Sequence, residues 1–220
     1  SSDVCSSDLD EIEKSNFYLN LSNFLNSKFI YNLSLTAENH FSNKEYKKAK
    51  KILKKFKKED DLYYWYRIKK EAQIIAKQRN KKESLNYITS NFDNIKQPNR
   101  RMILDIANFY KNSKKYEKAA KYYSEIINSL NKDPQIKSDV LYRRGGSYER
   151  LGNYEDADKD LLNSLKINPN DAYVLNYLAY SWLERDYKIN EAIEMLETAY
   201  ALKSNDPYII DSIGWAYYMV

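Results

Sequence analysis

The sequence is poor in the residues on which loop-rich folds depend. Its 220 residues include four glycines and four prolines. A β-sandwich or an α/β enzyme with glycine-bearing turns needs more of both, whereas their scarcity leaves long stretches free to form helices. The sequence therefore predicts an all-α protein.

The sequence also lacks the usual signatures of enzymes. It has no glycine-rich phosphate loop, no His/Cys metal-binding spacing and no nucleophile elbow. The single histidine, His40, falls in a slot that favours a packed imidazole over a catalytic base. Carboxylates are plentiful, but none forms a spaced pair that differs from ordinary helix surface charge. We expect no catalytic residue, no cofactor and no metal.

Long apolar runs and a large charge excess are missing as well. No run approaches the roughly 20 apolar residues that a transmembrane helix needs. The net charge of +5, from 36 basic and 31 acidic residues, is too small to predict nucleic-acid binding by itself. The compartment stays open between bacterial cytoplasm and cell envelope, and the oligomeric state is not readable.

The first nine residues, SSDVCSSDL, look like a translated sequencing adapter. We therefore set residues 1–9 aside as a non-native segment. The segment includes Cys5, the only cysteine, so no disulfide or thiol chemistry is expected. On this interpretation the native N-terminus lies outside the sequence.

Small residues recur with a period of about 35 residues, which indicates a repeat protein. Ala49, Ser84, Ala119, Ala157 and Ala192 mark one helix of each unit. Twelve or 13 positions earlier, Ala37, Ala72, Ala107, Gly145 and Ala179 mark its partner helix, and Gly214 continues the series. Helices approach closely where side chains are small. All four prolines, Pro98, Pro134, Pro169 and Pro207, fall between units, where a helix must stop.

Residues 138–171 resemble the tetratricopeptide motif closely. The resemblance rests on Leu141, Gly145, Tyr148, Gly152-Asn153-Tyr154, Ala157, Leu161 and Pro169. It implies an all-α, right-handed superhelix of helical hairpins with a concave groove. The expected organisation is a remnant second helix at 10–29, repeats at 30–61, 62–97, 98–135, 136–171 and 172–206, and the first helix of a further repeat at 207–220.

The last repeats are similar to a tetratricopeptide subfamily common in proteobacteria, some of whose members are exported or lipid-anchored partners of envelope enzymes. The resemblance supplies no site residue, but in this family one stripe of each first helix lines the groove that binds partner peptides or helices. The candidate residues on that stripe are Tyr66, Lys69, Arg101, Asn108, Tyr142, Tyr173, Asn176, Tyr180, Tyr208, Asp211 and Trp215.

Groove aromatics would anchor a protein partner, because they bury much area at little conformational cost. The alternative is that the 15% aromatic content reflects a base-composition bias and that these tyrosines merely coat the surface. A carboxylate clamp, as in some family members, is incomplete here, because Leu104 stands where a lysine would help. We predict a non-catalytic scaffold or adaptor that binds a protein in the groove.

Two charged features have competing interpretations. The run at 47–58, KKAKKILKKFKK, could be a helix that binds nucleic acid or an anionic membrane, but Ala49, Leu53 and Phe56 fit a packed seam with solvated lysines on its back. Arg144 falls in a core slot, so we expect a structural pair with Asp160 rather than an anion site. The chain could also be a non-catalytic segment of a larger enzyme.

Overall fold

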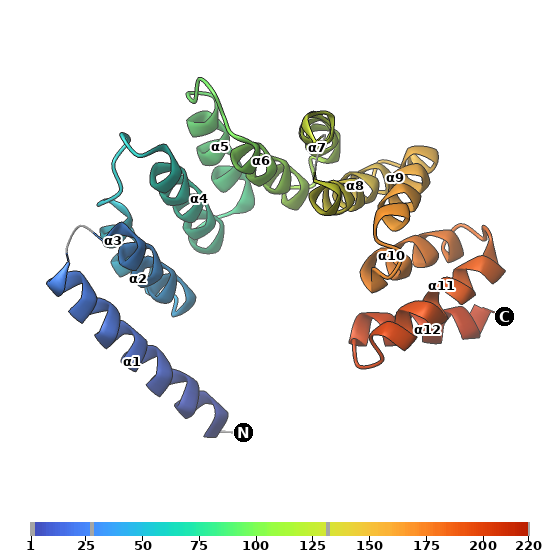
Figure 1. Ribbon diagram of the computed structural model, residues 1–220, viewed down its shortest axis with the longest axis horizontal. Helices are drawn as coiled ribbons and strands as arrows, with labels where there is room; N and C mark the ends of the chain where they lie inside the picture. Colours follow the sequence, from blue (N-terminus) through green and yellow to red (C-terminus); the bar gives the residue numbers. More distant parts are fainter. Residues whose placement is uncertain (1–2, 27–28, 131–132, 220) are drawn as a thin grey trace. The chain divides into compact units, whose positions relative to one another are not determined.

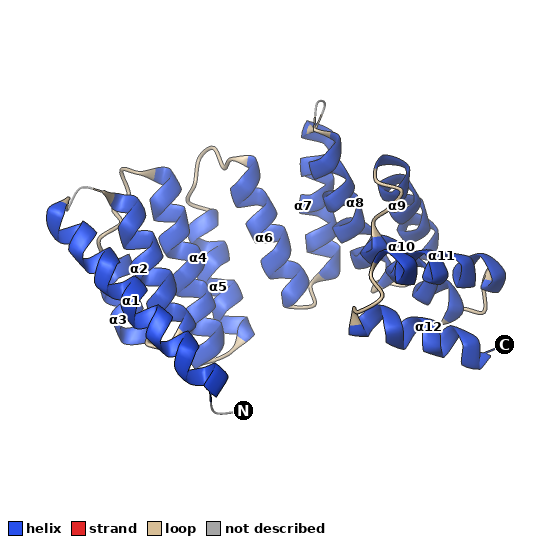
Figure 2. Cartoon of the chain, turned by 60° about the horizontal axis from the view of Figure 1, so that its bottom comes forward, coloured by secondary structure: helices blue, strands red, loops and turns tan. Residues whose placement is uncertain are grey.

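The computed structural model describes residues 3–26, 29–130 and 133–219, with side chains from residue 14 onward except that of residue 61. Within these ranges every regular element is a helix and no strand occurs, as the sequence predicts (Figure 2). The chain forms two compact units, residues 1–97 and 98–220. We describe each unit by itself.

The first unit consists of one long helix and two helical hairpins (Figure 1). Its helices are α1 (Asp3–Leu25), α2 (Ile30–Ser42), α3 (Tyr46–Leu53), α4 (Asp61–Gln78) and α5 (Lys81–Phe92). Helix α1 begins inside the segment that we set aside at 1–9. Helix α3 pairs with α2, and α5 pairs with α4.

The second unit consists of three helical hairpins and a final helix. Its helices are α6 (Arg100–Asn112), α7 (Tyr116–Ser129), α8 (Pro134–Glu149), α9 (Tyr154–Ile167), α10 (Ala172–Leu183), α11 (Ile189–Leu202) and α12 (Pro207–Met219). Each helix packs on the next one from α6 through to α12. In addition, α12 contacts α10, so successive first helices lie together at this end.

The recurrent small residues lie where the two helices of each hairpin meet. Every one of them is buried except Gly214, which is exposed. A Cβ atom at Gly145 would lie 3.0 Å from Cγ of Leu161, so α8 and α9 approach too closely there for a larger residue. The spacing of small residues therefore predicted the helix seams correctly.

Local signals explain where the helices begin. Asn80, Asn99, Asp133 and Asp171 each accept a hydrogen bond from a backbone N–H in the first turn of the helix that follows. Such caps satisfy donors that the helix itself leaves unpaired. Pro134 and Pro207 stand at the first position of α8 and α12, where a missing N–H does no harm.

The predicted pair between Arg144 and Asp160 is confirmed. Nε and Nη2 of Arg144 donate to the two carboxylate oxygens of Asp160 at 2.6 and 2.7 Å, and Nη1 donates to Oγ of Ser124 at 2.8 Å. These bonds raise the pKa of the Arg144 guanidinium, mainly through the Asp160 hydrogen bond. The Asp160 side chain is only 4% exposed, so the pair belongs to the core between α8 and α9.

The lysine-rich segment departs from the prediction in one respect. The helix expected at 47–58 ends at Leu53, and the residues after it form turns. Ala49, Leu53 and Phe56 are buried, as the packed-seam interpretation predicts.

None of the described helices is long and apolar enough to cross a membrane.

His40 closes the turn between α2 and α3. Its side chain is 18% exposed, which fits a largely packed imidazole, and its Nδ1 lies 2.6 Å from Oε2 of Glu45. Hydrogen bonds from Lys48 and then His40 lower the pKa of the Glu45 carboxyl. These contacts give His40 a structural role at the turn.

Candidate functional site

The first helices of the second unit carry most of the predicted groove residues. We call the surface that α6, α8, α10 and α12 present with these residues the first-helix face. Side chains link neighbouring helices across it: Nη1 of Arg143 in α8 donates to Oδ1 of Asn108 in α6 at 3.3 Å. The rings of Tyr142 in α8 and Tyr177 in α10 meet edge to face, 5.7 Å apart.

The α6–α8 part of the face is a polar network. Oδ1 of Asn108 accepts a second hydrogen bond from the hydroxyl of Tyr123 at 2.7 Å, while Nε of Arg143 donates to Asp139 at 2.9 Å. Burial lowers the pKa of Lys111 in the same region, with a further contribution from Arg143. Arg101 is exposed at the start of α6. Most polar atoms here already have partners within the unit.

The α8–α10 part is more apolar. Burial raises the pKa of both Tyr142 and Tyr177, and the Tyr177 hydroxyl donates to Oε2 of Glu149 at 2.9 Å. Oδ1 of Asn176 is buried and has no hydrogen-bond partner among the described residues. A buried amide oxygen without a partner is unfavourable by about 1 to 3 kcal/mol. This oxygen is enclosed within the chain, so a partner protein does not reach it in this arrangement.

At the start of α10, Tyr173 is held by residues that precede α12. Its hydroxyl donates to Oδ2 of Asp206 at 3.1 Å, and Nζ of Lys203 lies 4.4 Å from the centre of its ring. Tyr208, at the start of α12, is 77% exposed. These two tyrosines therefore differ: Tyr173 is engaged by the chain and Tyr208 faces solvent.

Toward the ends of α10 and α12 the face is hollowed into a cleft of about 570 Å³. Three of the predicted residues, Tyr180, Asp211 and Trp215, line this C-terminal cleft together. The other lining residues are Ile210, Gly214 and Tyr218. Tyr180, Trp215 and Tyr218 are 39%, 41% and 81% exposed, and the Trp215 and Tyr218 rings stack 5.7 Å apart.

Sequence reasoning missed Tyr218 and Ile210. Tyr218 follows Trp215 by three positions, so one more turn of the same helical stripe would have included it. Gly214 was assigned to the helix seam, but it lies open in the cleft. A Cβ atom built at Gly214 would have no other atom within 4 Å, so the position faces open space and not a helix seam.

The first unit holds the two remaining candidates. The Tyr66 hydroxyl donates to the carbonyl oxygen of Ser34 at 2.9 Å, and its ring packs edge to face on Phe56. Burial, reinforced by Glu38, raises the pKa of Tyr66. Lys69 is half-buried. Tyr66 is therefore largely used in packing within its own unit.

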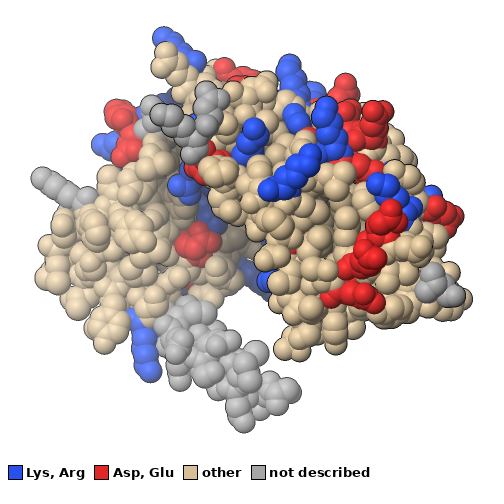
Figure 3. All heavy atoms as spheres, turned by 45° about the vertical axis from the view of Figure 1, so that its right-hand side comes forward, with Lys and Arg blue, Asp and Glu red and all other residues tan. Residues whose placement is uncertain are grey.

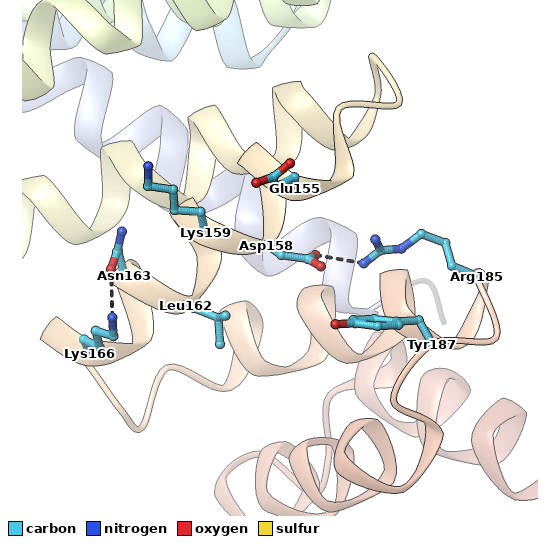
Figure 4. A pocket seen from close by; sticks show the side chains of 8 residues that line it. All are labelled: Glu155, Asp158, Lys159, Leu162, Asn163, Lys166, Arg185 and Tyr187. Carbon is cyan, nitrogen blue, oxygen red and sulfur yellow. Dashed lines mark hydrogen bonds and ion pairs between the residues drawn. The ribbon is translucent and has the colours of Figure 1, made fainter.

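A second pocket, of about 530 Å³, lies away from the first-helix face (Figure 4). We call it the α9 pocket, because α9 supplies most of its lining and the turn after α10 supplies Arg185 and Tyr187. Two of its cationic side chains have partners within the pocket: Arg185 donates to Asp158 at 2.8 Å, and Lys166 donates to the amide oxygen of Asn163 at 3.2 Å. Arg185 also lies over the Tyr154 ring at 4.5 Å.

Charged side chains of both signs are interspersed on the face shown in Figure 3. A continuous patch of positive charge would indicate binding to a phosphate backbone, and this face shows no such patch among the described residues. Among the described residues, no group of three or more His, Cys, Asp or Glu side chains is placed to hold a metal ion.

Comparison with known protein families decides the nature of the repeats. Two tetratricopeptide repeat models match, one over residues 138–171 and one over residues 101–129. These two stretches of the chain are tetratricopeptide repeats. The first match covers the stretch in which Gly145, Gly152 and Ala157 carried the resemblance.

Two curated relatives are proteins that contain tetratricopeptide repeats. One, from Methanocaldococcus jannaschii, is 41% identical over 80 residues, which is 36% of this chain and 13% of the relative. Another, from Pseudomonas aeruginosa, is 31% identical over 107 residues, which is 49% of this chain and 18% of the relative. The chain thus matches less than a fifth of the length of either relative.

Solved tetratricopeptide structures share the fold. The APC/C hetero-tetramer Cut9-Hcn1 includes a chain that matches with a TM-score of 0.68 and 17% identity, over 94% of this chain and 40% of that one. MamA from Desulfovibrio magneticus RS-1 matches with a TM-score of 0.56 and 15% identity, over 70% and 84%. At these identities the likeness establishes the fold class, an all-α array of helical hairpins.

Proposed function

We propose that this chain binds another protein through the first-helix face of its second unit, as a scaffold or adaptor without catalysis of its own. The C-terminal cleft would serve as the anchor point. The repeat fold supports this proposal, because arrays of stacked helical hairpins offer extended surfaces for recognition. We also propose that the five hairpins correspond to repeats at 30–61, 62–97, 98–135, 136–171 and 172–206.

The observation that carries the proposal is the exposure of three aromatic rings around one cleft. Tyr180, Trp215 and Tyr218 come from two neighbouring first helices and remain 39% to 81% exposed. Large aromatic side chains that line a concave site are the residues most often responsible for affinity in protein interfaces. Tyr142 and Tyr177, by contrast, are largely packed against each other.

Polar groups along the same face would orient the partner. Asn176 would contribute through its amide nitrogen, since its amide oxygen is enclosed within the chain. Asp211 in the cleft and Arg101 at the start of α6 would add charge complementarity. Asn108 would contribute through its amide nitrogen, since its oxygen already accepts two hydrogen bonds.

A matched pair of variants tests the proposal. The cleft variant combines Tyr180→Ala with Trp215→Ala. The control combines Tyr187→Ala with Tyr200→Ala, two exposed tyrosines outside the cleft. Each protein is used as affinity bait in extracts of the source cells, with quantitative mass spectrometry of the captured proteins and a melting curve for each bait.

The proposal predicts a protein captured by the wild type and the control and depleted at least tenfold with the cleft variant, which corresponds to about 1.4 kcal/mol of binding free energy. Equal capture by all three baits would contradict binding at the cleft. Capture that falls steeply with added salt and responds to Lys→Gln changes in 47–58 would instead assign binding to the lysine-rich segment.

A further inference from the structure

We infer that the C-terminal cleft receives a positively charged side chain, lysine or arginine, from the partner. This inference rests on the proposed function, because it specifies the chemistry of the partner at the same face. Two observations support it: the chemistry of the side chains that line the cleft, and the positions of this chain's own lysine and arginine side chains between aromatic rings and carboxylates.

Three aromatic residues line the cleft. Tyr180 comes from α10, while Trp215 and Tyr218 come from α12 and stack with an interplanar angle of 27°. The face of an aromatic ring carries partial negative charge, so it attracts ammonium and guanidinium groups, and tryptophan does so best. Tyr218 is 81% exposed, so its ring is open to such a group.

The charge in the cleft has one sign. Among the described lining residues there is one carboxylate, Asp211, and no lysine or arginine. Glu184 lies close enough to raise the pKa of the Tyr180 hydroxyl, after the larger effect of burial, and Asp211 acts in the same direction. An acidic partner side chain would meet repulsion here, whereas a basic one would meet both carboxylates and rings.

Elsewhere the chain satisfies the same combination of ring and carboxylate with a cation of its own. Lys70 lies 4.3 Å from the centre of the Phe41 ring and 2.7 Å from Glu38. Arg185 lies 4.5 Å from the centre of the Tyr154 ring and 2.8 Å from Asp158. Each of these cations is held between an aromatic face and a carboxylate.

Lys203 likewise lies over the Tyr173 ring, although the nearby Asp206 carboxylate accepts a hydrogen bond from the tyrosine hydroxyl and not from the lysine. At the C-terminal cleft the rings and the carboxylate are present, but the described lining contributes no cation. The partner is therefore the source of the cation that this arrangement fits.

The test uses four synthetic peptides of identical, otherwise neutral sequence whose central residue is lysine, arginine, norleucine or glutamate. Norleucine keeps the aliphatic stem of lysine without its charge. Binding is read from the indole N–H signal of Trp215 by NMR. Among the three tryptophans, Trp65 and Trp182 are 3% and 2% exposed, so Trp215 is the accessible reporter.

The lysine and arginine peptides should shift the Trp215 signal with an affinity about 3- to 30-fold higher than the norleucine peptide, and the glutamate peptide should bind most weakly. Asp211→Asn and Tyr218→Leu, made separately, should each reduce the preference for lysine over norleucine. Tyr200→Leu, a change of the same kind outside the cleft, should leave it unchanged. A melting curve confirms that each variant is folded.

Equal affinities for lysine and norleucine would overturn the inference, as would a Trp215 signal that no peptide shifts. Unchanged selectivity in both cleft variants would overturn it too. These results are distinguishable from failure of the proposed function. If the cleft variant still loses its captured protein while lysine and norleucine bind alike, the face binds a partner but not through a cation.

Discussion

The hairpins α8–α9 and α10–α11 fill the same repeat slots with different chemistry. When Gly145 is aligned with Ala179, Arg144 corresponds to Leu178 in the next repeat. Arg144 forms a two-pronged ion pair with Asp160, whereas Leu178 is buried in an apolar cluster. In two neighbouring repeats of one unit, the contact between the helices of the hairpin therefore contains an ion pair in one case and aliphatic packing in the other.

A second pair of slots shows the same contrast. Ser138 and Ser164 are buried in α8–α9, with their Oγ atoms 2.9 Å apart, and Oγ of Ser164 also contacts the carbonyl oxygen of Ser138 at 2.9 Å. The corresponding residues of α10–α11, Ala172 and Ala199, are buried without polar side chains. The repeat thus specifies the volume of each slot, and polar residues are accepted where they satisfy one another.

The largest expected effect comes from breaking the ion pair on one side. Asp160→Leu leaves the Arg144 guanidinium without its carboxylate in a largely buried site and should lower the free energy of unfolding by about 3 kcal/mol. Arg144→Met combined with Asp160→Leu imitates the apolar chemistry of the next repeat and should restore wild-type stability to within about 1 kcal/mol. Urea denaturation of both variants measures the difference. A double variant as unstable as the single would contradict the equivalence of the two seams.

The next effect concerns the dependence of stability on pH. Arg143 and Tyr177 occupy corresponding positions of the two repeats, and of the two only the tyrosine can lose its proton in the pH range of a denaturation experiment. Burial, with Glu149, raises the pKa of Tyr177 above its unfolded value of about 10. A raised folded pKa means that stability is fully present below about pH 10 and is lost as the unfolded tyrosine ionises above it. The contribution of Tyr177 to this loss should be about 1.4 kcal/mol at pH 11.

Comparing Tyr177→Phe with the wild type isolates that contribution. Denaturation at pH 8, 9, 10 and 11 should show that the free energy of unfolding falls less at alkaline pH in the variant than in the wild type. Other tyrosines with raised pKa values, such as Tyr123 and Tyr142, contribute to the fall in both proteins. Parallel pH profiles for the two proteins would show that Tyr177 does not resist ionisation in the folded state.

The serine pair predicts a smaller effect. Ser164→Ala removes one buried hydroxyl and should lower the free energy of unfolding by about 1 kcal/mol. Ser138→Ala with Ser164→Ala reproduces the Ala172 and Ala199 arrangement. Since both hydroxyls are then gone, the double variant should be no less stable than the single one. Thermal unfolding of the three proteins tests this, and additive losses would argue against the pair acting as a unit.

The smallest effect lies at the turns within hairpins. Gly152 has φ of 76° between α8 and α9, while Lys114 adopts φ of 58° in the equivalent turn between α6 and α7. A left-handed conformation suits glycine and strains a residue with a side chain. Lys114→Gly should therefore raise stability by about 0.5 kcal/mol, and Gly152→Ala should lower it. Chemical denaturation resolves the two signs, and a destabilised Lys114→Gly protein would reverse the argument.

Most of the fold could be predicted from the sequence because close helix contacts require small side chains at regular intervals. Ala107, Ala119 and Gly145 fall at those contacts, and Pro134 and Pro207 stand where helices begin. The helix expected at 47–58 was too long. The lysine-rich composition favours a helix throughout this segment, but α3 ends at Leu53. Phe56 is buried although it lies in the turn that follows the helix.

The site was less predictable. A stripe spacing identifies which side of a helix a residue occupies, but not whether a neighbour already uses its polar atoms. Asn108 and Tyr173 are engaged by their own unit, whereas Tyr180 and Trp215 meet in an open cleft. Tyr218 lies one turn beyond Trp215 on the same stripe, but only the structure shows that the two rings stack.

The most direct test of the account compares the C-terminal cleft with the α9 pocket by site-specific photo-crosslinking. The photoreactive residue p-benzoylphenylalanine replaces Tyr218 at the rim of the cleft in one protein and Tyr187 in the α9 pocket in the other. After irradiation in cells, the account predicts a crosslinked partner at position 218 and none at position 187. A partner crosslinked at position 187 alone would contradict recognition by the first-helix face.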